Sequence, residues 1–149
     1  MPTVLVVDDH EPIRVLCRAH LEQDGMHVIE AADGVQALER ARSERPDAVL
    51  LDVMLPRLSG WEVAEALRDE PETAGIPIVF ISAKTAQWDI AHGFELGGLD
   101  YLTKPFEPHA LAPLIRTLLE RIARGERELV RAERLDAVAA RLAETATRS

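Results

Sequence analysis

Residues 48–56, AVLLDVMLP, form an apolar run that ends in Asp52 and leads into a proline-containing turn. An apolar run without alternation of polar and apolar residues is typical of a strand covered on both faces, as in a parallel sheet. Residues 4–9, VLVVDD, have the same form, and residues 78–82, IVFIS, end in a serine. The sequence therefore predicts three buried strands that each end in polar side chains.

Segments with the spacing of amphipathic helices separate these strands from two further short runs, at residues 27–29 and 101–102. The result is a (βα)5 alternation over residues 3–122. Because each parallel connection needs a crossover, this pattern predicts a doubly wound α/β fold with a parallel five-stranded sheet. We expect the flavodoxin-like strand order 2-1-3-4-5, followed by a C-terminal helical extension.

Several helix starts are marked in the sequence. Residues 33–36 and 59–62 have the spacing of a capping box, in which side chains satisfy the free backbone donors of the first turn. Two more helices should begin near Thr85 and Glu107. Pro113 falls inside the last of these, where proline removes a donor and crowds the preceding turn, so we expect a kink or a late start there.

The overall composition limits the classes of function. Acidic residues outnumber basic ones 26 to 17, and the resulting charge of −9 disfavours direct contact with nucleic acid or anionic membranes. The single cysteine, Cys17, cannot form an internal disulfide, and no apolar run approaches the ~18 residues that span a membrane. We therefore expect a cytoplasmic protein without a membrane segment.

The chain changes character after residue 122. Residues 1–122 form the predicted domain and carry the acidity, whereas residues 123–149 hold six arginines against five acidic residues and no proline or aromatic residue. This segment is predicted to be a helix, which Gly125 could separate from the one before. One helical face carries Leu135, Val138 and Leu142. About two heptads of apolar pattern fall short of a secure coiled coil, so a homodimer through this face is a hypothesis.

The predicted strand ends gather reactive side chains at one edge of the sheet. Ligands of open parallel sheets bind at the carboxyl ends of the strands, where Asp8, Asp9, Asp52, Ser82 and Lys104 should meet. Close carboxylates repel one another unless a cation lies between them, and an oxygen-only donor set favours Mg²⁺ or Mn²⁺. Such a site suits a phosphoryl group, with one carboxylate as its covalent acceptor. Taken singly, each residue has a simpler explanation as a turn former, a helix cap or a surface charge.

These residues resemble the receiver domain of bacterial response regulators, the phosphorylated half of two-component signalling. The resemblance covers residues 3–122. Its motifs are Val6-Val7-Asp8-Asp9, Leu51-Asp52-Val53-Met54-Leu55-Pro56 with Gly60, Ile81-Ser82-Ala83, and Asp100-Tyr101-Leu102-Thr103-Lys104-Pro105-Phe106.

The resemblance implies a role for each residue at the strand ends. Asp52 would accept a phosphoryl group from a histidine kinase or a phosphotransfer protein. Asp9 and Asp52 would ligate Mg²⁺ together with the backbone carbonyl of Met54, and Asp8 would act through a bound water. Lys104 would pair first with Asp52 and then with the phosphoryl oxygens.

The resemblance also implies a switch. Ser82 would move toward the phosphoryl group, Tyr101 would follow it inward, and a cis peptide before Pro105 would position the neighbouring lysine. The surface of the fourth helix, fifth strand and fifth helix would then change. The protein would not be an enzyme with a separate substrate, but a signalling switch that promotes its own phosphorylation and dephosphorylation.

Two rival functions fit the sequence less well. Phosphatases of the haloacid dehalogenase type need a second aspartate two residues after the nucleophile, where this chain has Met54. A nucleotide-binding domain needs a loop of backbone donors after the first strand, whereas residues 9–12 read DHEP.

Output is expected through contact with a downstream protein. The alternative is a receiver fragment of a longer regulator, because the chain ends before a helix-turn-helix domain could follow. The missing output domain would then continue from residues 123–149, which would act as a dimerising linker helix.

Overall fold

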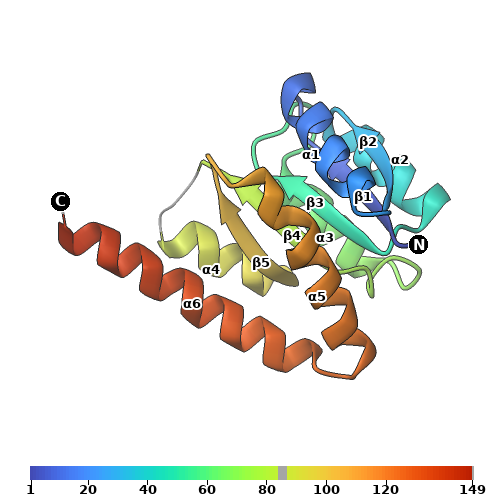
Figure 1. Ribbon diagram of the computed structural model, residues 1–149. Helices are drawn as coiled ribbons and strands as arrows, with labels where there is room; N and C mark the ends of the chain where they lie inside the picture. The colour runs from blue at the N-terminus through green and yellow to red at the C-terminus, as the bar shows by residue number, and fades with distance from the viewer. Residues whose placement is uncertain (84–86, 149) are drawn as a thin grey trace.

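A computed structural model, which describes residues 1–83 and 87–148, has five parallel strands in the order β2-β1-β3-β4-β5 (Figure 1). The strands are β1 (Thr3–Val7), β2 (His27–Ala31), β3 (Ala48–Asp52), β4 (Ile78–Ser82) and β5 (Gly98–Thr103). The helices are α1 (Glu11–Gln23), α2 (Gly34–Glu44), α3 (Gly60–Asp69), α4 (Gln87–Glu95), α5 (Leu111–Ala123) and α6 (Arg127–Arg148), with a 3-10 turn η1 (Pro108–Ala110) before α5. The predicted fold class and strand order are confirmed.

Helices cover both faces of the sheet, as the continuous apolar strands require. The side chains of α2, α3 and α4 pack on one face, in a cluster that includes Phe80 and Leu51. Those of α1 and α5 pack on the other face, in a cluster that includes Leu50 and Cys17. Alternate residues of each strand therefore enter opposite clusters, and the polar strand ends remain at the sheet's edge.

The helix starts predicted from capping residues are present in the structure. Ser59 and Glu62 form both bonds of a capping box at α3, and the Asp33 side chain accepts a hydrogen bond from the Gln36 backbone nitrogen at α2. Pro113 lies in the first turn of α5, after η1, so the late start is the observed outcome. The predicted start near Thr85 lies outside the described residues, and α4 is described from Gln87.

The C-terminal helix α6 packs back onto the domain. Gly125 has a positive φ of 79° and separates α5 from α6. Val138 is buried in the cluster beneath α4, and Leu135 packs against it, while the side chain of Leu142 lies outside the described residues. The apolar face proposed for dimerisation is thus used within the chain. Among the described helices, none combines the length and the apolar character needed to cross a membrane.

Candidate functional site

The register of the parallel strands brings the predicted polar ends to one edge. Val7 pairs with Leu51, and Leu51 pairs with Phe80, so the last residues of β1, β3 and β4 lie close to one level of the sheet. Asp8, which follows Val7, and Asp52, which ends β3, therefore leave the sheet side by side. Both carboxylates are buried. Because burying a charge is costly without a partner, this edge needs a cation.

Lys104 supplies that positive charge. Its Nζ lies 2.8 Å from Asp8 Oδ2 and 3.0 Å from Asp52 Oδ2. The lysine side chain is 21% exposed, so the ammonium lies at the mouth of the site while the carboxylates lie deeper. The resemblance implied the pairing with Asp52, and the structure adds a slightly shorter contact with Asp8.

The position of Lys104 is fixed by the backbone around it. Its amide nitrogen donates a hydrogen bond of 2.8 Å to the Ser82 carbonyl, which extends the pairing of β4 with β5 by one step. The peptide bond between Lys104 and Pro105 is cis, as the resemblance implied. The side chain leaves the end of β5 toward the two aspartates.

The ionisation of the site follows from burial and from these contacts. Burial raises the pKa of Asp52, the hydrogen bonds from the Met54 amide and Lys104 act in the opposite direction, and the charge of Asp8 adds to the rise. Burial would lower the pKa of Lys104, but its hydrogen bonds to both aspartates outweigh that effect and raise it. The lysine is therefore held charged, while burial makes ionisation of Asp52 less favourable than that of an aspartate in water.

Both carboxylates also accept hydrogen bonds from backbone amides. Asp52 Oδ1 accepts from the Met54 nitrogen at 3.0 Å, and Asp8 Oδ1 accepts from the His10 nitrogen at 2.9 Å. These bonds orient one oxygen of each group away from Lys104. The Met54 side chain is exposed beside the site.

Asp8, Asp9 and His10 form a cluster that could hold a metal ion, with one ligand atom from each within 4.8 Å of the others. His10 Nδ1 lies 3.2 Å from an oxygen of each aspartate. The donors from the two aspartates are hard oxygens, as Mg²⁺ prefers, and the excess negative charge calls for a cation, so the residues fit that ion. Asp52 belongs to the same site through Lys104 rather than through this cluster.

The contact of His10 with both aspartates was not predicted, because sequence spacing does not set the direction of a loop side chain. Arg14 was also missed. Its Nη1 donates a 2.7 Å hydrogen bond to the Asp8 carbonyl, and its Nε donates to Glu30. This arginine ties the end of β1 to α1 and to β2, and so steadies the acidic loop.

The backbone of Asp52 packs closely against Gly60, at the first turn of α3. A Cβ added at Gly60 would lie 2.3 Å from the Asp52 carbonyl oxygen and 2.7 Å from the Val53 Cα. The Gly60 amide donates a 2.8 Å hydrogen bond to the Val53 carbonyl. Only glycine permits this approach of the first turn of α3 to the end of β3.

The two residues assigned to the switch are both buried. Ser82 ends β4 and has no exposed surface, and Tyr101 lies next to Phe80 with ring centroids 6.3 Å apart. Burial raises the pKa of Tyr101 to about 12, and a hydrogen bond with Ser82 opposes the rise. The inward position of Tyr101, expected only after phosphorylation, is already present in this structure.

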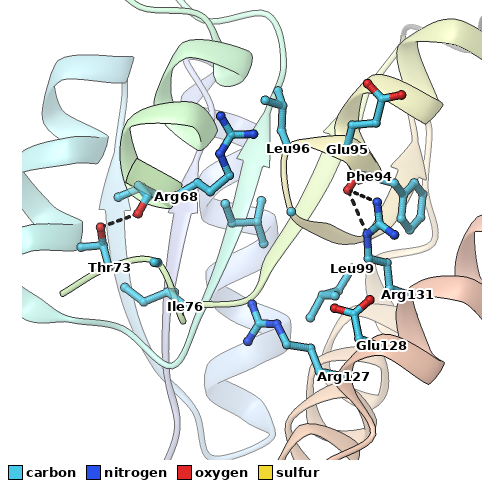
Figure 2. A pocket seen from close by; sticks show the side chains of 14 residues that line it. Arg68, Thr73, Ile76, Phe94, Glu95, Leu96, Leu99, Arg127, Glu128 and Arg131 are labelled. Atoms are coloured by element: carbon cyan, nitrogen blue, oxygen red, sulfur yellow. Dashed lines mark hydrogen bonds between the residues drawn. The ribbon is translucent and has the colours of Figure 1, made fainter. Parts of the chain in front are cut away.

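A pocket of about 300 Å³ lies elsewhere, at the opposite end of the sheet. Figure 2 shows it between the segment around Thr73, the end of α4 and the start of α6. Ile78 and Leu99, which line it, lie in the first two residues of β4 and β5, whereas the aspartates lie where the strands end. This pocket is therefore separate from the acidic site.

Residues 4–116 of the chain match a known protein family. The model of the response regulator receiver domain matches residues 4–116. That range contains all of the side chains at the strand ends.

Curated relatives and solved structures agree with this match. The chain is 44% identical over 118 residues to the alkaline phosphatase synthesis transcriptional regulatory protein PhoP of Bacillus subtilis, covering 79% of this chain and 48% of that protein. It is 39% identical over 126 residues to the phosphate regulon transcriptional regulatory protein PhoB of Pseudomonas aeruginosa, covering 85% and 55%. The structure of a Francisella response regulator receiver domain superimposes with a TM-score of 0.76 at 30% identity, covering 82% of this chain and 99% of that one.

Proposed function

The chain belongs to the response regulator receiver domain family, and we propose that it is a phosphorylation switch in which Asp52 accepts a phosphoryl group from a histidine kinase or a phosphotransfer protein. The observation that carries this proposal is the buried pair of carboxylates, Asp8 and Asp52, bridged by Lys104. A structural ion pair would need one carboxylate, whereas two around one ammonium leave a negative charge for a metal ion to balance.

The chemistry is the transfer of a phosphoryl group to a carboxylate oxygen. The Asp52 oxygen forms a bond to phosphorus, the bond between phosphorus and the donor's imidazole nitrogen breaks, and that nitrogen keeps the electron pair. Mg²⁺, held by Asp8 through water, by Asp9 and Asp52, and by the Met54 carbonyl, would neutralise the phosphoryl oxygens. Lys104 gives up part of its contact with Asp52 and pairs with a phosphoryl oxygen.

The readout is a change in the packing of α4, β5 and α5. Ser82 donates a hydrogen bond to the phosphoryl group, and Tyr101 holds the inward position beside it. The protein is thus a switch that promotes its own phosphorylation and dephosphorylation, and not an enzyme with a separate substrate. We assign it to the bacterial cytoplasm.

Output is proposed to occur through a downstream protein. The chain spans about half the length of the curated relatives it matches, and those relatives are named as transcriptional regulators. This supports the second candidate, a receiver that works with an output domain outside this sequence. In both cases the domain itself makes no direct contact with nucleic acid, in keeping with its charge of −9.

The test is phosphorylation by a small donor. Wild type and Asp52→Asn are incubated with acetyl phosphate, with MgCl₂ or with a chelator, and their intact masses are measured. We expect wild type to gain the mass of one phosphoryl group only with Mg²⁺, and the variant to gain none. An equal gain in both proteins would contradict the assignment of Asp52.

A further inference from the structure

The helix α6 covers the surface that the switch is proposed to change. It passes α4, β5 and α5 and contacts all three elements (Figure 1). As β5 is an edge strand, α6 lies across the open edge of the sheet. An exposed edge strand invites pairing with other chains, and a helix laid across it prevents this.

Arginines of α6 make polar contacts with β5 and α4, and Glu133 of α6 accepts a hydrogen bond of 2.6 Å from Arg121 Nη1 on α5. Arg134 Nε donates a 2.9 Å hydrogen bond to Asp100 Oδ2, a buried carboxylate on β5. Arg131 donates two hydrogen bonds, of 3.0 and 2.8 Å, to the Phe94 carbonyl in the last turn of α4 (Figure 2). Carbonyls at a helix C-terminus have no partner within the helix, so a guanidinium is a suitable donor there.

Apolar contacts accompany these hydrogen bonds on both faces of the sheet. Val130 is buried with the cluster beneath α5, and Val138 is buried with the cluster beneath α4. The neighbouring Ala137 is exposed, so α6 has one docked face and one solvent face. The surface therefore accepts an amphipathic helix with two apolar anchors and arginines at fixed positions between them.

The helix is an addition to the receiver unit. The family model ends at residue 116, before α6 begins. The Francisella receiver domain is covered over 99% of its own length by only 82% of this chain, so it folds without a share of sequence about the size of α6. Gly125, with its positive φ, is the turn on which α6 is joined to α5.

We propose that α4, β5 and α5 form a helix-binding surface, that α6 is its displaceable occupant, and that the downstream protein binds by presenting an amphipathic helix with arginines in place of α6. This inference rests on the proposed function, because it concerns the surface that phosphorylation would switch. Asp100, which anchors Arg134, is the neighbour of Tyr101 in β5, so the anchor and the switch residue share one strand.

The experiment displaces α6 in the full chain. Val138→Asp places a charge among apolar side chains and should undock the helix, while Ala137→Asp adds the same charge on its exposed face and is the matched control. Amide hydrogen exchange is measured for both. A labelled synthetic peptide of residues 126–148 then serves as the probe for the uncovered surface.

We expect the Val138→Asp chain to lose protection in α6 and to keep it in β1 and β3. It should bind the peptide at least about tenfold more tightly than wild type or Ala137→Asp, in which a tethered helix competes at a high effective concentration. A peptide with Arg134→Gln should bind more weakly. The milder chain variant Arg134→Ala should raise exchange in α6 by about tenfold, since a charged hydrogen bond is lost.

Three results would overturn the proposal. The first is unchanged protection of α6 in Val138→Asp, and the second is no binding of the peptide once α6 is undocked. The third is loss of amide protection throughout the sheet in both Val138→Asp and Arg134→Ala. The last would make the helix an integral part of the fold. Mass gain with acetyl phosphate is measured on the same proteins. If Asp52 gains no phosphoryl group in any of them, the proposed function fails while the binding result stands on its own.

Discussion

The variant Lys104→Met removes the ammonium that lies between two buried carboxylates and keeps much of the side chain's volume. Breaking a buried ion pair on one side costs about 3–5 kcal/mol, because it leaves a charge without a partner. Here the ammonium is partly exposed, and each carboxylate keeps one backbone donor. We therefore expect the free energy of unfolding to fall by about 2 kcal/mol in the presence of a chelator.

Magnesium should restore much of this loss, because the uncompensated carboxylates bind the ion more tightly and binding to the folded state adds stability. The assay is urea unfolding followed by the fluorescence of Trp61 and Trp88, with chelator and with MgCl₂, and an unchanged m-value is required. Asp52→Asn is the partner in a double-mutant cycle, in which the lysine substitution should cost less. A loss below about 0.5 kcal/mol, or a loss that is the same with and without Mg²⁺, would refute the electrostatic reasoning.

Three other outcomes are expected. Burial raises the pKa of Asp52, so the folded chain holds that proton more tightly than the unfolded chain does, and ionisation costs stability as the pH rises from the unfolded pKa through the folded one. Without divalent ions, Asp52→Asn should therefore gain stability relative to wild type over that rise in pH, and urea titrations that show a shrinking difference would count against this. Gly60→Ala should lose about 1–3 kcal/mol in the same assay, because its Cβ meets the Asp52 backbone, while Gly75→Ala, with open space around it, should change little. Burial raises the pKa of Cys17 to about 12, so a thiol reagent at neutral pH should modify it only in urea, and rapid reaction of the folded chain would contradict its burial.

The sequence was sufficient to predict where these polar side chains lie because the strands are continuous apolar runs. Where such a run ends in a polar residue, the carboxyl edge of the sheet is the position that the residue must take, and this holds for Asp52, Ser82 and Asp8. The contact of Lys104 with both aspartates required the actual register of β5, whose pairing with β4 shifts between Ile78 and Val79.

Other features could not be predicted from spacing. The pattern of Leu135 and Val138 shows which face of α6 is apolar, but it carries no information on what covers that face, and the structure places the domain's own clusters there. The contacts of His10 and Arg14 depend on side-chain directions in a loop and at a helix start, which local sequence leaves open. Such contacts are set by tertiary packing.

The strand β5 carries the anchor of α6 on one residue, the tyrosine proposed for the switch on the next, and the lysine of the acidic site just beyond its end. A protein that displaces α6 would therefore act on the same strand as the proposed phosphorylation. By thermodynamic reciprocity, the factor by which phosphorylation changes the docking equilibrium of α6 equals the factor by which undocking of α6 changes the equilibrium of phosphorylation. A downstream target would then prolong or shorten the signal that it receives.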